Sequence, residues 1–171
     1  MTTHGDPIDL ILKQWSNERP KLDSSGFAVV GRILLLGKLL ESRVTQVLAP
    51  LSLSAFDVLA TLRRQGAPFS LTPTQLSRAT LLTSGAMTSR LDRLEKAKLV
   101  QRSPDPEDRR GVRVALTDQG LELVDRAIET RFEEALDAVS QLPPEDRVAL
   151  GDLLRTLTAS LPPTPRKEQS T

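Results

Sequence analysis

The segment from Thr72 to Thr117 limits what this 171-residue chain can fold into, because it combines helix caps, a turn and alternating strand residues in a fixed order. Thr72-Pro73-Thr74-Gln75 provides an N-cap, a first-turn proline and a capping-box glutamine, which together predict a helix of about two turns. After a tight turn near Leu81, Thr83 or Ser84 is expected to cap a second helix that ends near Ala97.

Two strand-like segments and a charged turn follow that second helix. Leu99-Val100-Gln101-Arg102 is predicted to be extended, and residues 112–116 alternate in polarity as a half-buried strand does. The turn between them, residues 104–111, is predicted to carry Arg109 and Arg110 at its tip. The predicted order is therefore helix, turn, helix and β-hairpin, within a chain that is otherwise mainly α-helical.

The residues before this segment predict three helices. Ile8, Leu12 and Trp15 recur at helical spacing, and the helix they mark is expected to end before Pro20. Residues 27–48 are apolar on more than one side and predict a long central helix. Ser54 is expected to be the N-cap of the third helix.

Two further helices are predicted after the hairpin. Thr117 is expected to cap a long helix, and Pro143-Pro144 is expected to start a final one. Residues 163–171 are polar and rich in proline, which predicts a disordered tail.

Composition narrows the possible functions. The chain has no cysteine, and its only histidine, His4, lies in a polar N-terminal stretch. The residue types that thiol chemistry, metal sites and histidine-based catalysis require are therefore absent or nearly absent. No enzyme activity, metal or cofactor is expected. The apolar stretches are far shorter than the roughly 20 residues that span a bilayer, and a cytoplasmic protein without membrane contact is expected.

The second helix of the segment has a face suited to nucleic acid. Met87, Leu91 and Leu94 define its inward side, and Ser89 and Arg93 fall on the opposite side. A helix of this kind fits the DNA major groove, while Arg109 and Arg110 could enter a minor groove or pair with phosphate. From residue 83 to 113, eight Lys and Arg stand against five Asp and Glu, although an ordinary solvated turn would also explain the two turn arginines.

These motifs resemble the MarR family of winged helix-turn-helix regulators across nearly the whole chain. The resemblance is carried by the helix at residues 84–95, the strand at 99–102, and Asp105-Pro106-Glu107-Asp108-Arg109-Arg110 running into residues 114–117. It implies a homodimer built from both ends of the chain. The implied organisation is residues 1–50 as N-terminal helices for dimerisation and a ligand pocket wall, 51–116 as the DNA-binding domain, 117–162 as C-terminal dimerisation helices, and 163–171 as the tail.

The resemblance also implies roles for single residues. Arg110 would be the arginine of the wing that enters the minor groove, with Arg109 beside it, and Asp108 would orient it. The residues that would face bases or phosphates are Ser84, Thr88, Ser89 and Arg93. A two-fold dimer further implies double-stranded DNA with a pseudo-palindromic operator, its half-sites about one helical turn apart.

Four more residues match the narrower pattern of the urate-responsive branch of that family: Trp15, Asp57, Arg90 and Arg102. In that branch, the residues that correspond to Trp15 and Arg90 hold a purine-like anion. Those that correspond to Asp57 and Arg102 link the ligand pocket to the DNA-binding lobe. A guanidinium suits such an anion. Simpler roles stay open: packing for Trp15, helix capping at N3 for Asp57, and phosphate contacts for Arg90 and Arg102.

The resulting hypothesis is a repressor released by a small anionic aromatic ligand, urate or a related purine. Two alternatives stay open. One is the same fold responding to a phenolic or lipophilic compound. The other is a helical interaction module without DNA binding.

Overall fold

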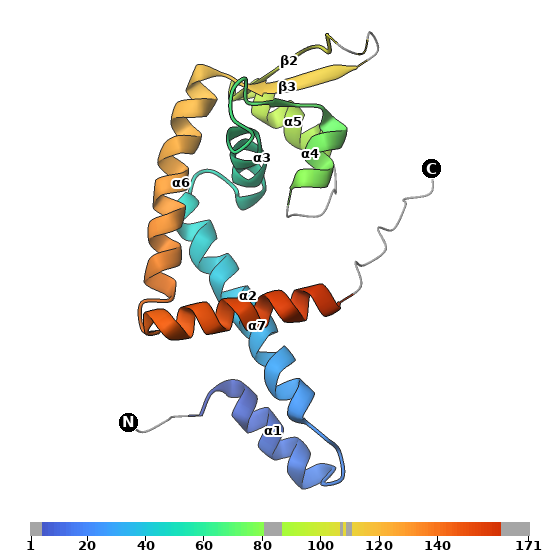
Figure 1. The fold of residues 1–171 in the computed structure, drawn as a ribbon, viewed down its shortest axis with the longest axis vertical. Coiled ribbons are helices and arrows are strands. Elements are labelled where there is room, and N and C mark those ends of the chain that lie inside the picture. Colours follow the sequence, from blue (N-terminus) through green and yellow to red (C-terminus); the bar gives the residue numbers. More distant parts are fainter. Residues whose placement is uncertain (1–4, 81–86, 107, 109–110, 162–171) are drawn as a thin grey trace. The chain divides into compact units, whose positions relative to one another are not determined.

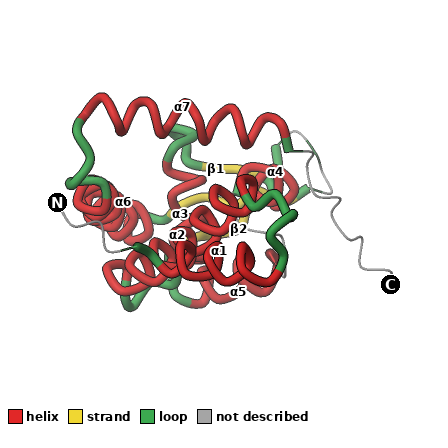
Figure 2. The backbone as a smooth tube through the Cα atoms, turned by 90° about the horizontal axis from the view of Figure 1, so that it is seen from below, coloured by secondary structure: helices red, strands yellow, loops and turns green. Residues whose placement is uncertain are grey.

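The structure of the chain is a computed structural model that describes residues 5–80, 87–106, 108 and 111–161. Helices form most of the described backbone, and strands are confined to one small sheet (Figures 1 and 2). The elements in chain order are α1 (Pro7–Glu18), α2 (Ser25–Leu48), α3 (Leu53–Arg63), β1 (Ser70–Leu71), α4 (Pro73–Ala79), α5 (Met87–Lys96), β2 (Val100–Pro104), β3 (Val112–Leu116), α6 (Asp118–Ala138) and α7 (Pro144–Ser160).

The chain divides into two compact units, Met1–Glu134 and Ala135–Thr171. The first holds α1 to α5, the sheet and most of α6. The second holds the end of α6 and α7. The predicted tail at residues 163–171 lies outside the described residues, as does His4.

The predicted hairpin is confirmed, and the sheet has one strand more than predicted. Its order is β1-β3-β2, with antiparallel pairs throughout, and Arg102 of β2 lies opposite Val114 of β3. β1 has only two residues, which is too short for alternation of side chains to reveal it in the sequence. β1 is recognised as a strand only by its backbone pairing with β3.

Two predicted helix caps are also confirmed, while the predicted turn near Leu81 and the cap at Thr83 or Ser84 lie outside the described residues. Thr72 and Gln75 form the capping box of α4, and the Thr117 hydroxyl accepts a hydrogen bond from the Gly120 amide at 3.0 Å. The predicted N-cap of α3 was wrong, because Ser52 occupies that position instead of Ser54. The Ser52 backbone is extended, and its hydroxyl accepts the Ala55 amide at 3.2 Å, so Ser54 lies in the first turn.

One hydrophobic core in the first unit joins α3, α4, α5, α6 and the sheet. From α5 it takes Met87, Leu91 and Leu94, all of them buried. The core therefore holds α5 by one face. The other buried core residues are Val58, Leu59, Leu62, Leu76, Leu99, Val100, Val114, Leu116 and Val124.

No single helix within the described ranges is long and apolar enough to cross a membrane. α2 and α3 reach that length and composition only as a pair, and the pair is bent by 77° at its break.

Candidate nucleic-acid interface

α5 presents chemically different faces around its axis. Thr88, Ser89 and Arg93 are exposed, and Arg90 is half-buried at the edge of the inward face. The predicted orientation of this helix is confirmed, because the apolar residues expected to face inward are the buried ones. Small hydroxyl groups and an arginine are thus available to a partner on the outer side.

Part of the predicted interface lies outside the described residues, namely Ser84, Arg109 and Arg110. Asp108 is described and exposed, and its backbone carbonyl accepts a hydrogen bond from the Gly111 amide at 2.8 Å. The role expected of the Asp108 carboxylate toward Arg110 stays a prediction.

The base of the wing is closed by residues that the sequence reasoning missed. Asp105 is buried, its amide donates to the Gly111 carbonyl at 3.0 Å, and its carboxylate pairs with Arg113 at 3.2 Å. A Cβ on Gly111 would come within 3.0 Å of the Asp105 Cβ, so the turn closes tightly at this glycine. A carboxylate between two prolines, eight residues before an arginine on the opposite strand, is the signal that could have indicated this pair.

The flank of α5 toward β2 is acidic and is held by Arg102. The Arg102 guanidinium pairs with Asp92 at 2.7 Å and with Glu95 at 2.7 Å, and its amide donates to the Glu95 carboxylate at 3.2 Å. The hydrogen bond with Asp92, supported by the charges of both carboxylates, raises the pKa of Arg102 above its ordinary value despite partial burial. This guanidinium is engaged with the helix itself.

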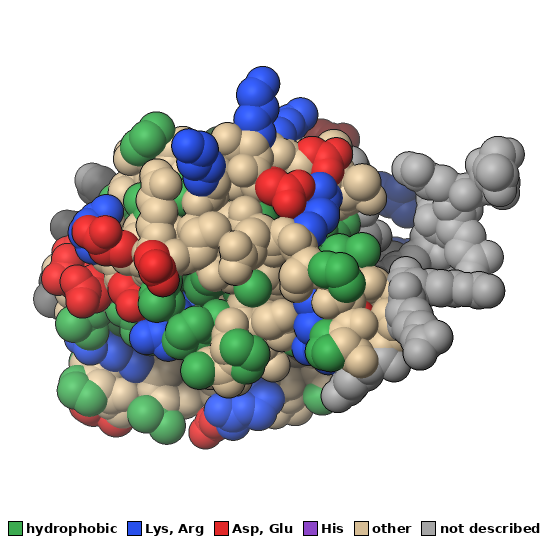
Figure 3. Space-filling model, turned by 90° about the horizontal axis from the view of Figure 1, so that it is seen from above, with side chains coloured by type: hydrophobic (Ala, Val, Ile, Leu, Met, Phe, Trp, Pro, Cys, Tyr) green, Lys and Arg blue, Asp and Glu red, His purple; other side chains and the backbone are tan. Residues whose placement is uncertain are grey.

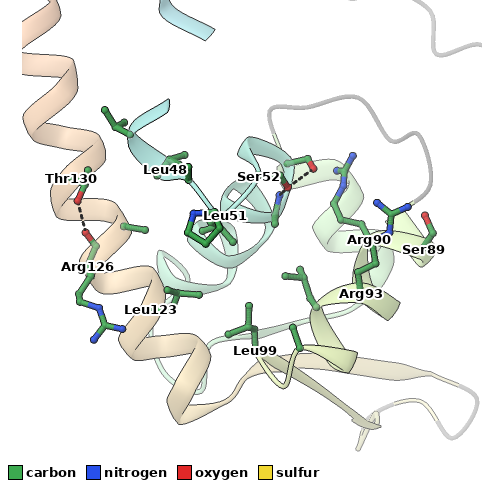
Figure 4. Close-up of a pocket in the computed structure, with 18 residues that line it drawn as sticks. Leu48, Leu51, Ser52, Ser89, Arg90, Arg93, Leu99, Leu123, Arg126 and Thr130 are labelled. Carbon is green, nitrogen blue, oxygen red and sulfur yellow. Dashed lines mark hydrogen bonds between the residues drawn. The ribbon is translucent and has the colours of Figure 1, made fainter. Parts of the chain in front are cut away.

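The opposite flank of α5 lines a groove of about 710 Å³. Figure 4 shows Arg90 and Arg93 on the α5 side of this groove, Leu123 and Arg126 on the α6 side, and Leu51 between them. Among the described residues that line it there is no Asp or Glu, so its arginines give a positive wall that otherwise carries apolar and hydroxyl side chains. Its other lining residues are Val47, Leu48, Ala49, Pro50, Ser52, Ser54, Ala55, Ser89, Leu94, Ala97, Leu99, Ala127 and Thr130.

Of the four residues predicted for an effector, only Arg90 lines this groove. Trp15 lies on α1 with 49% of its surface exposed, and Arg102 lies on the other flank of α5. Asp57 is buried in α3, as the fifth residue of that helix. Its alternative role at position N3 was wrong, because the N-cap at Ser52 places Ala55 there.

The surface around the sheet end carries both signs of charge. Seen from above, Lys and Arg side chains stand among acidic and apolar ones and form no uniform basic field (Figure 3). Any attraction to nucleic acid therefore depends on where individual arginines lie, as the net charge of +1 indicates.

Known proteins resemble this chain in both sequence and fold. The sequence profile of the MarR family matches residues 49–111. The transcriptional regulator PecS of Dickeya dadantii is 40% identical over 146 residues, which cover 84% of this chain and 88% of PecS.

Two solved structures are similar to it as well. One is Sco3205, a MarR family transcriptional regulator from Streptomyces coelicolor in complex with DNA, with a TM-score of 0.73, 26% identity, and coverage of 85% of this chain and 93% of that one. The other is BpsR of Bordetella bronchiseptica, described with regulation of its DNA binding by 6-hydroxynicotinic acid, with a TM-score of 0.69, 28% identity, and coverage of 83% and 99%.

Two successive helices, α4 and α5, followed by an antiparallel sheet with a charged turn define the class of winged helix-turn-helix DNA-binding proteins. Within that class, the chain belongs to the MarR family. It is a DNA-binding transcriptional regulator and not an enzyme.

Proposed function

We propose that this regulator is a homodimeric repressor of a pseudo-palindromic operator, released from DNA by a small anionic aromatic ligand. The observation that carries the proposal is the position of Arg93 and Arg90, which belong to the exposed helix α5 and also line the groove between α5 and α6. A ligand that binds these guanidinium groups has a different affinity for the free and the DNA-bound states, which release requires.

On the DNA side, α5 enters the major groove. Thr88, Ser89 and Arg93 face bases or phosphates, since all three are exposed. Ser84, which precedes α5 in the sequence, is proposed to extend this set. Arg109 and Arg110 contact the adjacent minor groove, with Asp108 beside them. The complex of Sco3205 with DNA supports the same use of the shared fold.

The homodimer is supported by apolar surface that a single chain leaves uncovered. None of the 17 residues of α7, all of them described, is buried, and Val148 and Leu153 are 66% and 69% exposed. α2 likewise exposes Leu34 and Leu39. Apolar side chains exposed along each of these two helices are the kind of surface that a protein interface covers. A two-fold dimer would then place two α5 helices on successive major grooves.

The effector is proposed to be urate or a related purine. Arg90 supplies charge and paired donors to a planar anion in the groove. Trp15, which does not line the groove, is assigned an aromatic face for the ligand on the pattern of the urate-responsive branch alone. Asp57 and Arg102 couple the site to the DNA-binding lobe, as the pattern of the urate-responsive branch implies. Regulation of BpsR by 6-hydroxynicotinic acid, a planar aromatic acid, supports this class of ligand.

A phenolic or lipophilic effector is the second candidate, and the composition of the groove favours it. The three arginines that line the groove, Arg90, Arg93 and Arg126, are accompanied by apolar side chains. Four of these are leucines: Leu48, Leu51, Leu94 and Leu123. Such a wall accepts a ligand with little charge as readily as an anion.

The test is a binding titration with a duplex from the promoter region of the regulator's own gene. Purified protein is expected to bind this duplex, and urate is expected to weaken the complex. Quenching of Trp15, the single tryptophan, by phenolic compounds without any response to purines would select the second candidate. Failure to bind any fragment of that region would contradict the repressor itself.

A further inference from the structure

The two flanks of α5 have opposite charge, and only the acidic one is joined to the wing. We propose that Arg102 is a positioning residue that fixes α5 relative to β2, so that preference for operator over other DNA depends on the cluster of Arg102, Asp92 and Glu95. This inference rests on the proposed function, in which α5 enters the major groove. It assigns to the two acids of that helix a role in specificity.

The cluster joins two elements through three polar contacts from one residue. Arg102 lies in the middle of β2, opposite Val114, and is therefore held by the sheet. Its guanidinium reaches both carboxylates, and its backbone amide reaches Glu95 as well. Because one contact comes from the backbone, α5 is tied to the strand itself and not only to a long side chain.

The core alone leaves the rotation of α5 weakly restrained. It holds the helix through three apolar residues on one stripe, and apolar contacts have no direction. Hydrogen bonds, in contrast, weaken steeply once length and angle leave a narrow range. Asp92 and Glu95 are one turn apart on one flank, so a guanidinium that binds both restrains how the helix turns about its axis.

Charge alone predicts the opposite effect for these acids. Asp92 and Glu95 are partly exposed on the helix proposed to approach DNA phosphates, with side-chain exposures of 57% and 39%. Carboxylates near phosphates repel them, so their removal should strengthen binding to any DNA. A position-setting role predicts that removal lowers the preference for operator. The two explanations therefore differ in whether the ratio of operator to non-operator affinity changes, since charge alone leaves that ratio unaltered.

The experiment compares the dissociation constants for the operator and for a scrambled duplex of equal length. For D92N/E95Q we expect equal or tighter binding to the scrambled duplex and a roughly tenfold lower operator preference, as for residues coupled in one network. R102K should lose preference similarly, because an ammonium group cannot hold both carboxylates in the same fork. Combining R102K with D92N/E95Q should add little further loss, since all three changes break the same cluster.

A matched control is the pair of Arg63 on α3 and Asp125 on α6, which joins two elements of the same unit at 2.6 Å without touching α5. R63K/D125N should leave the operator preference unchanged. Unchanged preference in D92N/E95Q, or a loss of preference in R102K that adds fully to the loss in D92N/E95Q, would overturn the inference. A wild-type protein that itself shows no operator preference would instead contradict the proposed function.

Discussion

Gly120 lies directly against the carbonyl oxygen of Leu99. A Cβ on this glycine would stand 1.9 Å from that oxygen, and the neighbouring Thr117 amide donates to the same carbonyl at 3.2 Å. The first turn of α6 is thereby packed on the backbone that leads into β2. The contact joins the DNA-binding sheet to the long helix that follows it.

G120A is therefore expected to destabilise the chain by about 2–4 kcal/mol, because backbone atoms must move to admit the methyl group. Chemical denaturation measures this loss. G26A on α2 is the control, since a Cβ there would meet nothing within 4 Å beyond its own helix backbone and chain neighbours, and its effect should stay within about 1 kcal/mol. Equal stability of G120A and wild type would contradict this packing.

Glu134 joins α6 to α2 through a nearly buried carboxylate. Arg43 and Arg131 contact it at 3.0 and 2.9 Å, and its side chain is 4% exposed. E134A should cost about 1–2 kcal/mol, less than for a fully buried pair because Arg43 stays partly solvated. E122A, which removes the exposed partner of Arg126, should change the free energy of unfolding by less than about 0.5 kcal/mol.

Asp6 makes the attachment of α1 sensitive to acid. Desolvation raises the pKa of Asp6, but hydrogen bonds from Arg32 and from the amides of Asp9 and Ile8 outweigh it, so that the pKa lies below the ordinary 3.8. A carboxylate with a lowered pKa stabilises the fold above its unfolded pKa, and this contribution is lost as pH falls through the folded value.

The emission of Trp15 on the same helix should therefore stay constant above about pH 5 and change as pH falls below the ordinary carboxylate range. D6N should show part of the acid-state signal already at neutral pH, because an amide cannot form the charged contacts with Arg32, whereas Asp9 still pairs with that guanidinium. Identical pH profiles for D6N and wild type would show that this contact does not hold α1.

R110A tests the proposed contact of the wing with the minor groove. Loss of one phosphate-neutralising cation should weaken binding to every sequence and reduce the slope of log K against log salt by about one. Fluorescence anisotropy at several salt concentrations measures both quantities. An R110A protein with wild-type affinity would remove Arg110 from the DNA interface.

The sequence by itself determined the parts of the fold that depend on near neighbours. The capping box of Thr72 and Gln75, the hydroxyl cap of Thr117 and the buried stripe of α5 all use groups within one or two turns of each other. Such contacts have the same spacing in any protein. Even so, spacing could not rank the two serines at the start of α3. Ser52 is the N-cap because its backbone is extended, whereas Ser54 lies in the first turn.

Only the tertiary structure decided which side chains meet across elements. It joined Arg102 to Asp92 and Glu95, paired β1 with β3, and brought Arg90 and Arg93 of α5 to the same groove as residues of α6. These contacts depend on which elements the fold packs side by side and on the register of each strand. A guanidinium can pair with any carboxylate that lies within a few ångströms. The packing of the elements, and not the residue type alone, therefore determines which carboxylate an arginine meets.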